Sequence, residues 1–228
     1  MKTSERAINI PLGNITLSGD LSMPATARGL VLFAHGSGSS RRSPRNRYVA
    51  GVLEKGGIAT LLFDLLTEAE ERIDQYTAEL RFDIGLLASR LVAATDWVTE
   101  SGESDDAIKD LPIGYFGAST GAAAALIAAA WRRDVAAIVS RGGRPDLAGD
   151  ALPLVKAPTL LIVGGSDEPV IGMNEEAQGQ MKAETRLEII PGATHLFEEP
   201  GALQQVASLA RRWFEKHFAG KQKIEHAA

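Results

Sequence analysis

The sequence has 228 residues, 45% of them hydrophobic and 23% charged, which is enough for one globular domain with a sizeable core. Its 24 lysine and arginine residues against 29 aspartate and glutamate residues give a formal net charge of −5, which argues against nucleic acid or anionic lipid as a partner. The chain contains no cysteine, and this excludes disulfides, thiol nucleophiles and thiolate metal sites.

The two ends and the apolar runs of the chain bear on its location. Residues 1–10 lack the apolar segment of a secretory signal, and the longest strongly apolar run, Ala122–Trp131, is too short to span a bilayer. We therefore expect a cytoplasmic protein that does not bind membranes, either a monomer or a homodimer. We expect residues 1–228 to form a single domain, with the polar residues 220–228 as a frayed tail.

Short apolar segments indicate the strands. Two alternating segments, 8–10 and 15–21, are split by Gly13-Asn14 and predict an antiparallel hairpin at a sheet edge. Six later runs, rich in leucine or in β-branched residues, predict buried parallel strands. These runs are Leu30–Ala34, Ala59–Phe63, Ile113–Phe116, Val135–Val139, Thr159–Val163 and Leu187–Ile190.

Helical patterns fall between these strands. The predicted helices are Arg47–Lys55, Glu79–Glu100, Ser119–Arg132, Gly172–Lys182 and Ala202–Phe218. Strands that alternate with helices predict an α/β protein, with a mostly parallel sheet flanked by helices and ligands at the carboxyl ends of the strands. For the acidic connection 64–79 we expect either a mobile flap or a solvated helix.

The sequence Gly117-Ala118-Ser119-Thr120-Gly121 follows one of the predicted strands and precedes an alanine-rich helix. A serine in such a strand-to-helix turn adopts strained backbone angles, and glycines two residues away on each side relieve the crowding. The turn lifts the hydroxyl towards substrate, and Ser119 is therefore the predicted nucleophile.

A serine nucleophile needs a general base, and the chain has four histidines. His195 lies in a loop just after the last predicted strand, from which it can fold over the sheet edge towards Ser119, and we predict that it is the base. We expect His35, next to the strand Leu30–Ala34, to brace its loop by hydrogen bonding. His217 and His226 are interpreted as solvated residues.

The base needs a carboxylate to orient it, and this is expected after the strand Thr159–Val163. Asp167 and Glu168 both lie there, and we favour Asp167 because Glu168 precedes a proline that restricts its backbone. The resulting order Ser119, Asp167, His195 is the chain order expected for a serine nucleophile in this kind of turn.

Acyl transfer also needs donors for the oxyanion. We predict the backbone N–H of Thr120, the residue after the nucleophile, as one donor. The other is expected from His35-Gly36-Ser37-Gly38, whose glycines let the backbone approach a ligand. We favour the N–H of Ser37, with Gly38 as an alternative, and expect this loop to contact substrate.

Arginines gather beside this loop in an otherwise acidic protein. Arg41, Arg42, Arg45 and Arg47 lie there, and Arg141 and Arg144 follow a later strand. One hypothesis is that one or two of them, with Arg42 and Arg141 as the candidates, bind a carboxylate or phosphate of the substrate. The alternative is a solvated, locally ion-paired loop.

From the His35-Gly36 loop through Gly117–Gly121 and Asp167 to His195, the chain resembles the small dienelactone-hydrolase-like branch of the α/β-hydrolase superfamily. The resemblance implies an eight-stranded, mostly parallel sheet and hydrolysis of esters or related acyl compounds. One departure is that dienelactone hydrolases proper carry a cysteine nucleophile, whereas this chain has none. Family members often insert a lid after the strand that here is Val135–Val139; only residues 140–157 follow it, which predicts a minimal lid and an open site.

The expected function is hydrolysis of small-molecule carboxylic esters through an acyl-enzyme, with no metal or organic cofactor. An acyl-CoA or other thioester hydrolase would use the same residues, and a perhydrolase side activity is compatible with them. A ligand-binding protein that retains the fold without catalysis is an alternative of a different class.

Overall fold

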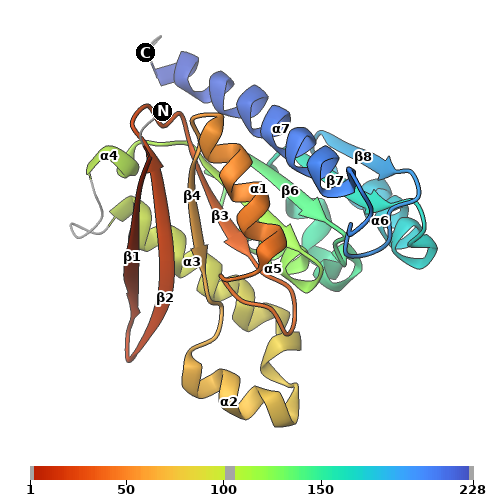
Figure 1. Cartoon of the computed structure of the whole chain (residues 1–228), viewed down its shortest axis with the longest axis horizontal. Coiled ribbons are helices and arrows are strands. Elements are labelled where there is room, and N and C mark those ends of the chain that lie inside the picture. Colours follow the sequence, from red (N-terminus) through yellow and green to blue (C-terminus); the bar gives the residue numbers. More distant parts are fainter. Residues whose placement is uncertain (1–2, 101–105, 226–228) are drawn as a thin grey trace.

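The computed structural model describes residues 3–100 and 106–225, and this part of the chain contains an eight-stranded sheet with the order β1-β2-β4-β3-β5-β6-β7-β8 (Figure 1). The strands are β1 (Thr3–Leu12), β2 (Ile15–Pro24), β3 (Leu30–Ala34), β4 (Ala59–Phe63), β5 (Ile113–Ala118), β6 (Ala137–Arg141), β7 (Thr159–Gly164) and β8 (Thr185–Ile190). Strands β3 to β8 pair in parallel, whereas β1 pairs with β2, and β2 with β4, in antiparallel fashion. The sheet is therefore mixed, with the hairpin at one edge.

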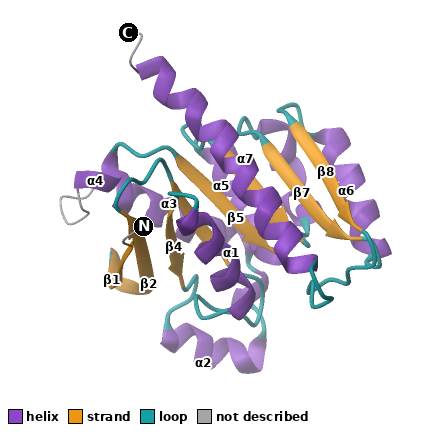
Figure 2. Ribbon diagram, turned by 45° about the horizontal axis from the view of Figure 1, so that its top comes forward, coloured by secondary structure: helices purple, strands orange, loops and turns teal. Residues whose placement is uncertain are grey.

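Helices cover both faces of this sheet (Figures 1 and 2). One face carries α1 (Pro44–Lys55) and α7 (Ala202–Glu225), and the other carries α3 (Ile84–Glu100), α5 (Thr120–Trp131) and α6 (Glu168–Gln180). The short helix α4 is Asp106–Lys109, and 3₁₀ segments are Leu80–Phe82 and Pro145–Leu154. Helix α2 (Glu68–Thr77) lies away from the sheet, beyond the end of β4. The architecture is that of an α/β-hydrolase.

The two faces of the central strand β5 pack differently. On the α1 and α7 face, aromatic side chains fill the space, and the rings of Phe33 and Phe116 lie 4.8 Å apart. On the other face, the side chains of Ala122–Ala125 in α5 are fully buried, and their small size lets the helix approach the sheet closely.

Two glycines make this approach possible. A Cβ atom at Gly121 would lie 2.5 Å from the carbonyl oxygen of His35 and would overlap that of Ala34. A Cβ atom at Gly117 would lie 2.7 Å from the backbone nitrogen of Ala122. Real Cβ atoms do not come this close to other backbone atoms, so both positions require glycine for steric reasons.

The predicted hairpin and the six predicted strands are confirmed, and the short connection after β6 contains only the 3₁₀ segment Pro145–Leu154. The single helix predicted over Glu79–Glu100 is wrong. Asp83 leaves the helical region (φ −76°, ψ 81°), and its Oδ1 accepts a 2.9 Å hydrogen bond from the N–H of Leu86. The Asp83 carboxylate therefore caps the N-terminus of α3, which is a separate helix.

The last helix is longer than predicted. It continues beyond Gly220 to Glu225, where the sequence suggested a frayed tail from residue 220. Residues 226–228 of that predicted tail lie outside the described residues.

The acidic connection 64–79 contains helix α2, which is anchored to the rest of the protein. Thr67 and Glu70 form a capping box, in which the Oγ1 of Thr67 accepts from the N–H of Glu70, and Glu70 accepts from the N–H of Thr67. Glu70 also accepts hydrogen bonds of 2.6 and 2.9 Å from the guanidinium of Arg90 in α3. Of the two alternatives for this segment, the helix is confirmed.

The Arg90 guanidinium and the Thr67 groups lower the pKa of Glu70 from 4.5 to about 2, against the opposing effect of burial. Because the folded pKa is depressed, this carboxylate stabilises the fold fully above pH 4.5, and the contribution is lost as the pH falls towards 2. We expect Glu70→Gln to lower the free energy of unfolding by about 1–2 kcal/mol at pH 7. The deficit relative to wild type should shrink as the pH falls through this window, as urea unfolding at several pH values would measure.

Glu68→Gln provides the control for this prediction, because Glu68 lies in the same first turn of α2 but is exposed. An equal loss of stability in this variant, with the same dependence on pH, would contradict a specific role for the Glu70–Arg90 pair.

The glycine contacts yield a second prediction. Gly121→Ala should lower the free energy of unfolding by about 1–3 kcal/mol, because the added methyl group forces the backbone of α5 away from β3. Gly172→Ala is the matched control, since Gly172 lies inside α6 with no atom near its Cβ position. That change should instead stabilise the protein by about 0.5–1 kcal/mol. Similar effects in both variants, measured by urea unfolding, would refute the steric argument.

Candidate active site

The predicted site residues gather where the parallel strands end. The loop 35–38 follows β3, Ser119 follows β5, Asp167 follows β7, and His195 follows β8. The carboxyl ends of neighbouring parallel strands meet at one edge of a sheet, which brings these distant segments together.

The backbone of Ser119 has φ 51° and ψ −121°, a conformation that residues other than glycine rarely adopt. Its N–H donates a 3.2 Å hydrogen bond to the carbonyl oxygen of Arg141 in β6. Its own carbonyl oxygen accepts hydrogen bonds of 3.1 Å from the N–H groups of Ala122 and Arg144. These three bonds fix the strained turn, and the Ser119 side chain remains partly exposed.

Asp167 and His195 form the predicted pair. The Nδ1 of His195 lies 2.7 Å from the Oδ2 of Asp167, and because an ionised carboxylate only accepts, Nδ1–H is the donor. This tautomer leaves the lone pair of Nε2 available to take a proton. The alternative carboxylate, Glu168, begins α6 and is exposed, so geometry favours Asp167.

Backbone contacts hold the loops of this pair together. The N–H of Ser166 donates a 2.9 Å hydrogen bond to the carbonyl oxygen of Ala193, and that of Gly165 donates at 2.8 Å to Ile190. At Gly164, a Cβ atom would lie 2.7 Å from the carbonyl oxygen of Thr194 and would overlap that of Ala193. The carbonyl oxygens of Ala193 and Thr194, which precede His195, therefore occupy space that a side chain at position 164 would fill.

The His195 ring lies against the strand neighbouring Ser119. A Cβ atom on Gly142 would be 3.5 Å from the Cε1 of His195, and Gly142 follows the residue whose carbonyl holds the Ser119 N–H. Within residues 3–100 and 106–225, the Ser119 hydroxyl makes no hydrogen bond. Hydrogen bonds between a nucleophile and its base are often longer before substrate binds. The arrangement therefore brings the three predicted residues to one place, and their catalytic roles remain predictions.

The loop after β3 lies against Ser119, as the oxyanion prediction requires. A Cβ atom on Gly36 would be 3.1 Å from the Cβ of Ser119. The N–H of Ser37 donates a 2.9 Å hydrogen bond to the Oγ1 of Thr120, and Gly38 turns the loop with a positive φ of 66°. Thus the Thr120 hydroxyl holds the amide predicted as a donor, a contact that nothing in the sequence indicated.

His35 has both ring nitrogens engaged by the protein. Its Nε2 accepts a 3.0 Å hydrogen bond from the N–H of Leu65, and its Nδ1 lies 3.0 Å from the carbonyl oxygen of Gly36. Burial lowers the pKa of His35, which favours the neutral ring. This geometry supports the bracing role and leaves neither ring nitrogen free for the contact with substrate that was expected of this loop.

The arginines of the predicted cluster fall into three groups: those paired with a carboxylate, one that is exposed and one that is buried. Four members have carboxylate partners: Arg41 with Asp64 and Asp20, Arg45 with Glu198, Arg47 with Glu5, and Arg144 with Asp146. Arg42 is exposed, whereas Arg141 is buried with only 7% of its surface accessible. For the four paired arginines, the locally ion-paired alternative is the better description.

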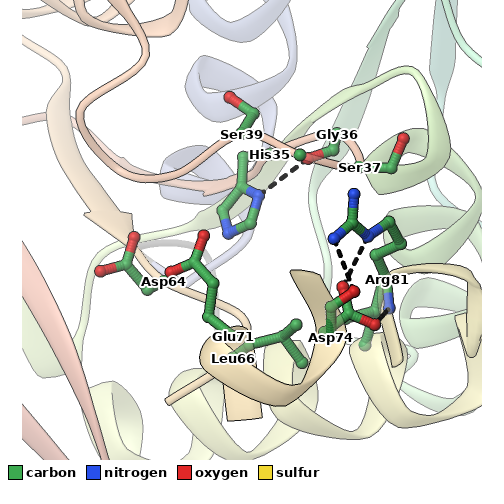
Figure 3. A pocket seen from close by; sticks show the side chains of 11 residues that line it. His35, Gly36, Ser37, Ser39, Asp64, Leu66, Glu71, Asp74 and Arg81 are labelled. Carbon is green, nitrogen blue, oxygen red and sulfur yellow. Dashed lines mark hydrogen bonds and ion pairs between the residues drawn. The ribbon is translucent and has the colours of Figure 1, made fainter. Parts of the chain in front are cut away.

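A pocket opens between the loop after β3 and helix α2 (Figure 3). Leu66 and Leu87 supply apolar walls, and Arg81 reaches towards Ser37. Arg81 is fixed by Asp74, whose Oδ2 accepts a 2.6 Å bond from the Arg81 Nε. Burial raises the pKa of Asp74, but hydrogen bonds from Arg81 and Leu80 outweigh it and hold this pKa below its ordinary value.

The part of the chain that the structure describes holds no group of three or more histidine, aspartate and glutamate residues suited to a metal ion. None of its helices is both long and apolar enough to cross a membrane.

Comparison with known proteins identifies the family. No family model matches the chain. A solved structure of a dienelactone hydrolase from Anabaena variabilis is 61% identical, with a TM-score of 0.91 over 95% of this chain and 99% of that one. The Est1E protein from Butyrivibrio proteoclasticus is 18% identical, with a TM-score of 0.75 over 93% of this chain and 99% of that one. The second likeness shows the fold alone.

Two curated proteins from strains of Mycobacterium tuberculosis are 55% identical to this chain over 217 residues. Both carry the provisional name phosphoribosyl transferase. The match covers 95% of this chain but 47% of each relative, so the chain spans about half of their length.

The identity to the Anabaena protein extends over nearly the full length of both chains, and the fold agrees with it. The chain therefore belongs to the dienelactone hydrolase family and has the α/β-hydrolase fold.

Proposed function

We propose that the protein hydrolyses carboxylic esters of small molecules through an acyl-enzyme on Ser119. The observation that carries this proposal is the strained Ser119 turn at the same sheet edge as the 2.7 Å Asp167–His195 pair. A strained serine and an oriented imidazole are the two parts that nucleophilic acyl transfer requires.

In the proposed reaction, the Nε2 of His195 takes the Ser119 proton as the hydroxyl oxygen attacks the ester carbonyl. Asp167 stabilises the imidazolium that forms and keeps the ring in the productive tautomer. The imidazolium then protonates the leaving alcohol, and the acyl group remains on Ser119. His195 next activates a water molecule, which hydrolyses the acyl-enzyme and regenerates the serine.

The backbone amides of Thr120 and Ser37 are the proposed donors to the oxyanion. The Thr120 amide lies at the N-terminus of α5, where the helix dipole favours negative charge. The Ser37 amide already donates to a hydroxyl oxygen, that of Thr120, so a substrate oxygen would share or replace this acceptor. The chemistry proposed here calls for no metal or organic cofactor.

The name of the mycobacterial relatives describes a different reaction. Because this chain matches about half of their length, the name of the whole relative does not by itself assign a transferase reaction to the matching half. Thioesters would react by the same steps, and a panel of matched esters and thioesters would separate the two substrate classes.

An activated serine reacts with a fluorophosphonate probe, and this gives the most direct test. We expect the wild-type protein to be labelled at Ser119, as located by mass spectrometry, and to hydrolyse p-nitrophenyl acetate. Ser119→Ala should lose both properties, because it lacks the nucleophilic oxygen. Absence of labelling and of turnover in folded wild-type protein would count against a hydrolase and in favour of a binding protein.

The role of Asp167 is tested by Asp167→Asn, which keeps the size of the side chain but favours the wrong imidazole tautomer. We expect kcat to fall by about 10⁴-fold, as at other aspartates of such triads. Glu168→Gln removes a charge from the adjacent residue, whose side chain is exposed, and should leave kcat close to wild type. Equal losses in the two variants would exclude a specific role for Asp167.

A further inference from the structure

The hydroxyl group of Thr120 is buried, and its hydrogen has no acceptor in the protein. Thr120 begins α5 directly after Ser119, and only 4% of its surface is accessible. Its Oγ1 accepts a 2.9 Å hydrogen bond from the N–H of Ser37. Across residues 3–100 and 106–225, no protein atom accepts a hydrogen bond from this hydroxyl. Because a hydroxyl can donate one hydrogen bond as well as accept, the donor of Thr120 is available to a ligand.

The contacts of Oγ1 place it in the proposed oxyanion site. The Ser37 N–H points at this oxygen, and the same N–H is a proposed donor to the oxyanion. The loop that carries Ser37 lies against the nucleophile, since a Cβ atom on Gly36 would be 3.1 Å from the Cβ of Ser119. The other proposed donor, the backbone N–H of Thr120, belongs to the same residue as the hydroxyl. A substrate oxygen that accepts from Ser37 must therefore come close to Oγ1.

A substrate oxygen can reach the Ser37 amide in two ways. It can displace Oγ1, which requires rotation of the Thr120 side chain about its Cα–Cβ bond, or it can share the amide with Oγ1. Threonine is branched at Cβ, so one of the two other staggered positions puts the methyl group where Oγ1 now lies. Close packing around a residue that is only 4% accessible also opposes this rotation. Sharing requires only that the hydroxyl hydrogen turns about the Cβ–Oγ1 bond.

Sharing puts a negatively charged oxygen beside Oγ1. Two oxygen atoms without a hydrogen between them repel each other, so the Thr120 hydrogen must point to the oxyanion. The N–H of Ser37 polarises the hydroxyl from the opposite side, and a hydroxyl that accepts a hydrogen bond becomes a stronger donor. The hydroxyl can therefore accept from Ser37 and donate to the substrate at the same time.

We propose that the Thr120 hydroxyl is a catalytic group, which donates a hydrogen bond to the oxyanion while it accepts one from the Ser37 amide. This inference rests on the proposed function and adds a side-chain donor to the two backbone amides. The bond strengthens as negative charge develops on the carbonyl oxygen. It therefore lowers the barrier to acyl transfer and has little effect on substrate binding.

The first experiment compares two variants of Thr120 on p-nitrophenyl butyrate. Thr120→Val removes the hydroxyl but keeps the branched shape, and Thr120→Ser keeps the hydroxyl. For Thr120→Val we expect kcat to fall by about 10²-fold, as when one oxyanion donor is removed elsewhere, with KM within about threefold of wild type. Thr120→Ser should restore kcat to within about fivefold of wild type, because the donor is present again.

Thr159→Val is the matched control, because Thr159 is fully buried but lies at the amino end of β7, away from the site. Its hydroxyl donates a 3.0 Å hydrogen bond to the carbonyl oxygen of Ala157. This variant should leave kcat close to wild type.

Three kinetic results would overturn the proposal. A rise of kcat in Thr120→Val would mean that the hydroxyl masks the Ser37 amide. Unchanged kcat would mean that the hydroxyl does not act in the reaction. Equal losses in Thr120→Val and Thr120→Ser would assign the effect to packing of the methyl group.

The second experiment uses the wild-type protein and so does not depend on the folding of a variant. A crystal structure of the adduct between Ser119 and a small alkyl fluorophosphonate places a phosphoryl oxygen where the oxyanion would lie. We expect the Oγ1 of Thr120 at about 2.5–3.0 Å from this oxygen, with the bond from the Ser37 N–H retained. A hydroxyl that has rotated away, or one that contacts only Ser37, would overturn the proposal.

The two proposals fail in distinguishable ways. Absence of labelling at Ser119 in the folded wild-type protein would overturn the proposed function and this inference with it. Normal labelling and turnover, combined with wild-type kcat in Thr120→Val or with no contact between Oγ1 and the phosphoryl oxygen, would overturn this inference alone.

Discussion

The left-handed backbone of Ser119 is the constraint on which the site depends. Such a conformation costs about 1–3 kcal/mol and persists only where its surroundings fix it. Here the fixation comes from three backbone hydrogen bonds, to Arg141, Ala122 and Arg144. It also comes from the close contact of α5 with β3, which Gly121 permits. Gly117 and Gly121 are therefore required for steric reasons that are independent of catalysis. Ser119 is the residue of the strained turn whose side chain is partly exposed.

Two charged side chains lie near the Ser119 turn: Asp167, which pairs with His195, and Arg141, whose carbonyl oxygen accepts from the Ser119 N–H. Asp167 lies beside His195, so its negative charge has a hydrogen-bond donor 2.7 Å away. The Arg141 guanidinium lies 5.9 Å from the centre of the Phe197 ring, and no carboxylate within residues 3–100 and 106–225 forms an ion pair with it. In the proposed reaction the charge of Asp167 acts on the imidazolium that forms during acyl transfer.

Much of the fold could be predicted because its strands are short apolar runs whose ends are marked by glycine or proline. The site residues could be predicted where chemistry restricts the residue type, as for Ser119 and the Asp167–His195 pair. The boundary at Asp83 was missed because helical periodicity continues across it, and only the side-chain bond to Leu86 separates the two segments. Helix α2 was left open although Thr67 and Glu70 have the spacing of a capping box. The isolation of Arg141 could not be predicted, because which arginines find carboxylates depends on contacts distant in sequence.

The position of the pocket bears on how a substrate would lie in the site. The pocket lies on the α2 side of the loop after β3, and its walls include Leu66 and Leu87. Ser37, whose amide is a proposed oxyanion donor, belongs to the same lining. In the proposed reaction the oxyanion donors hold the ester carbonyl at this end of the pocket. One portion of the ester, acyl or alcohol, would then extend into the partly apolar space beside Leu66 and Leu87.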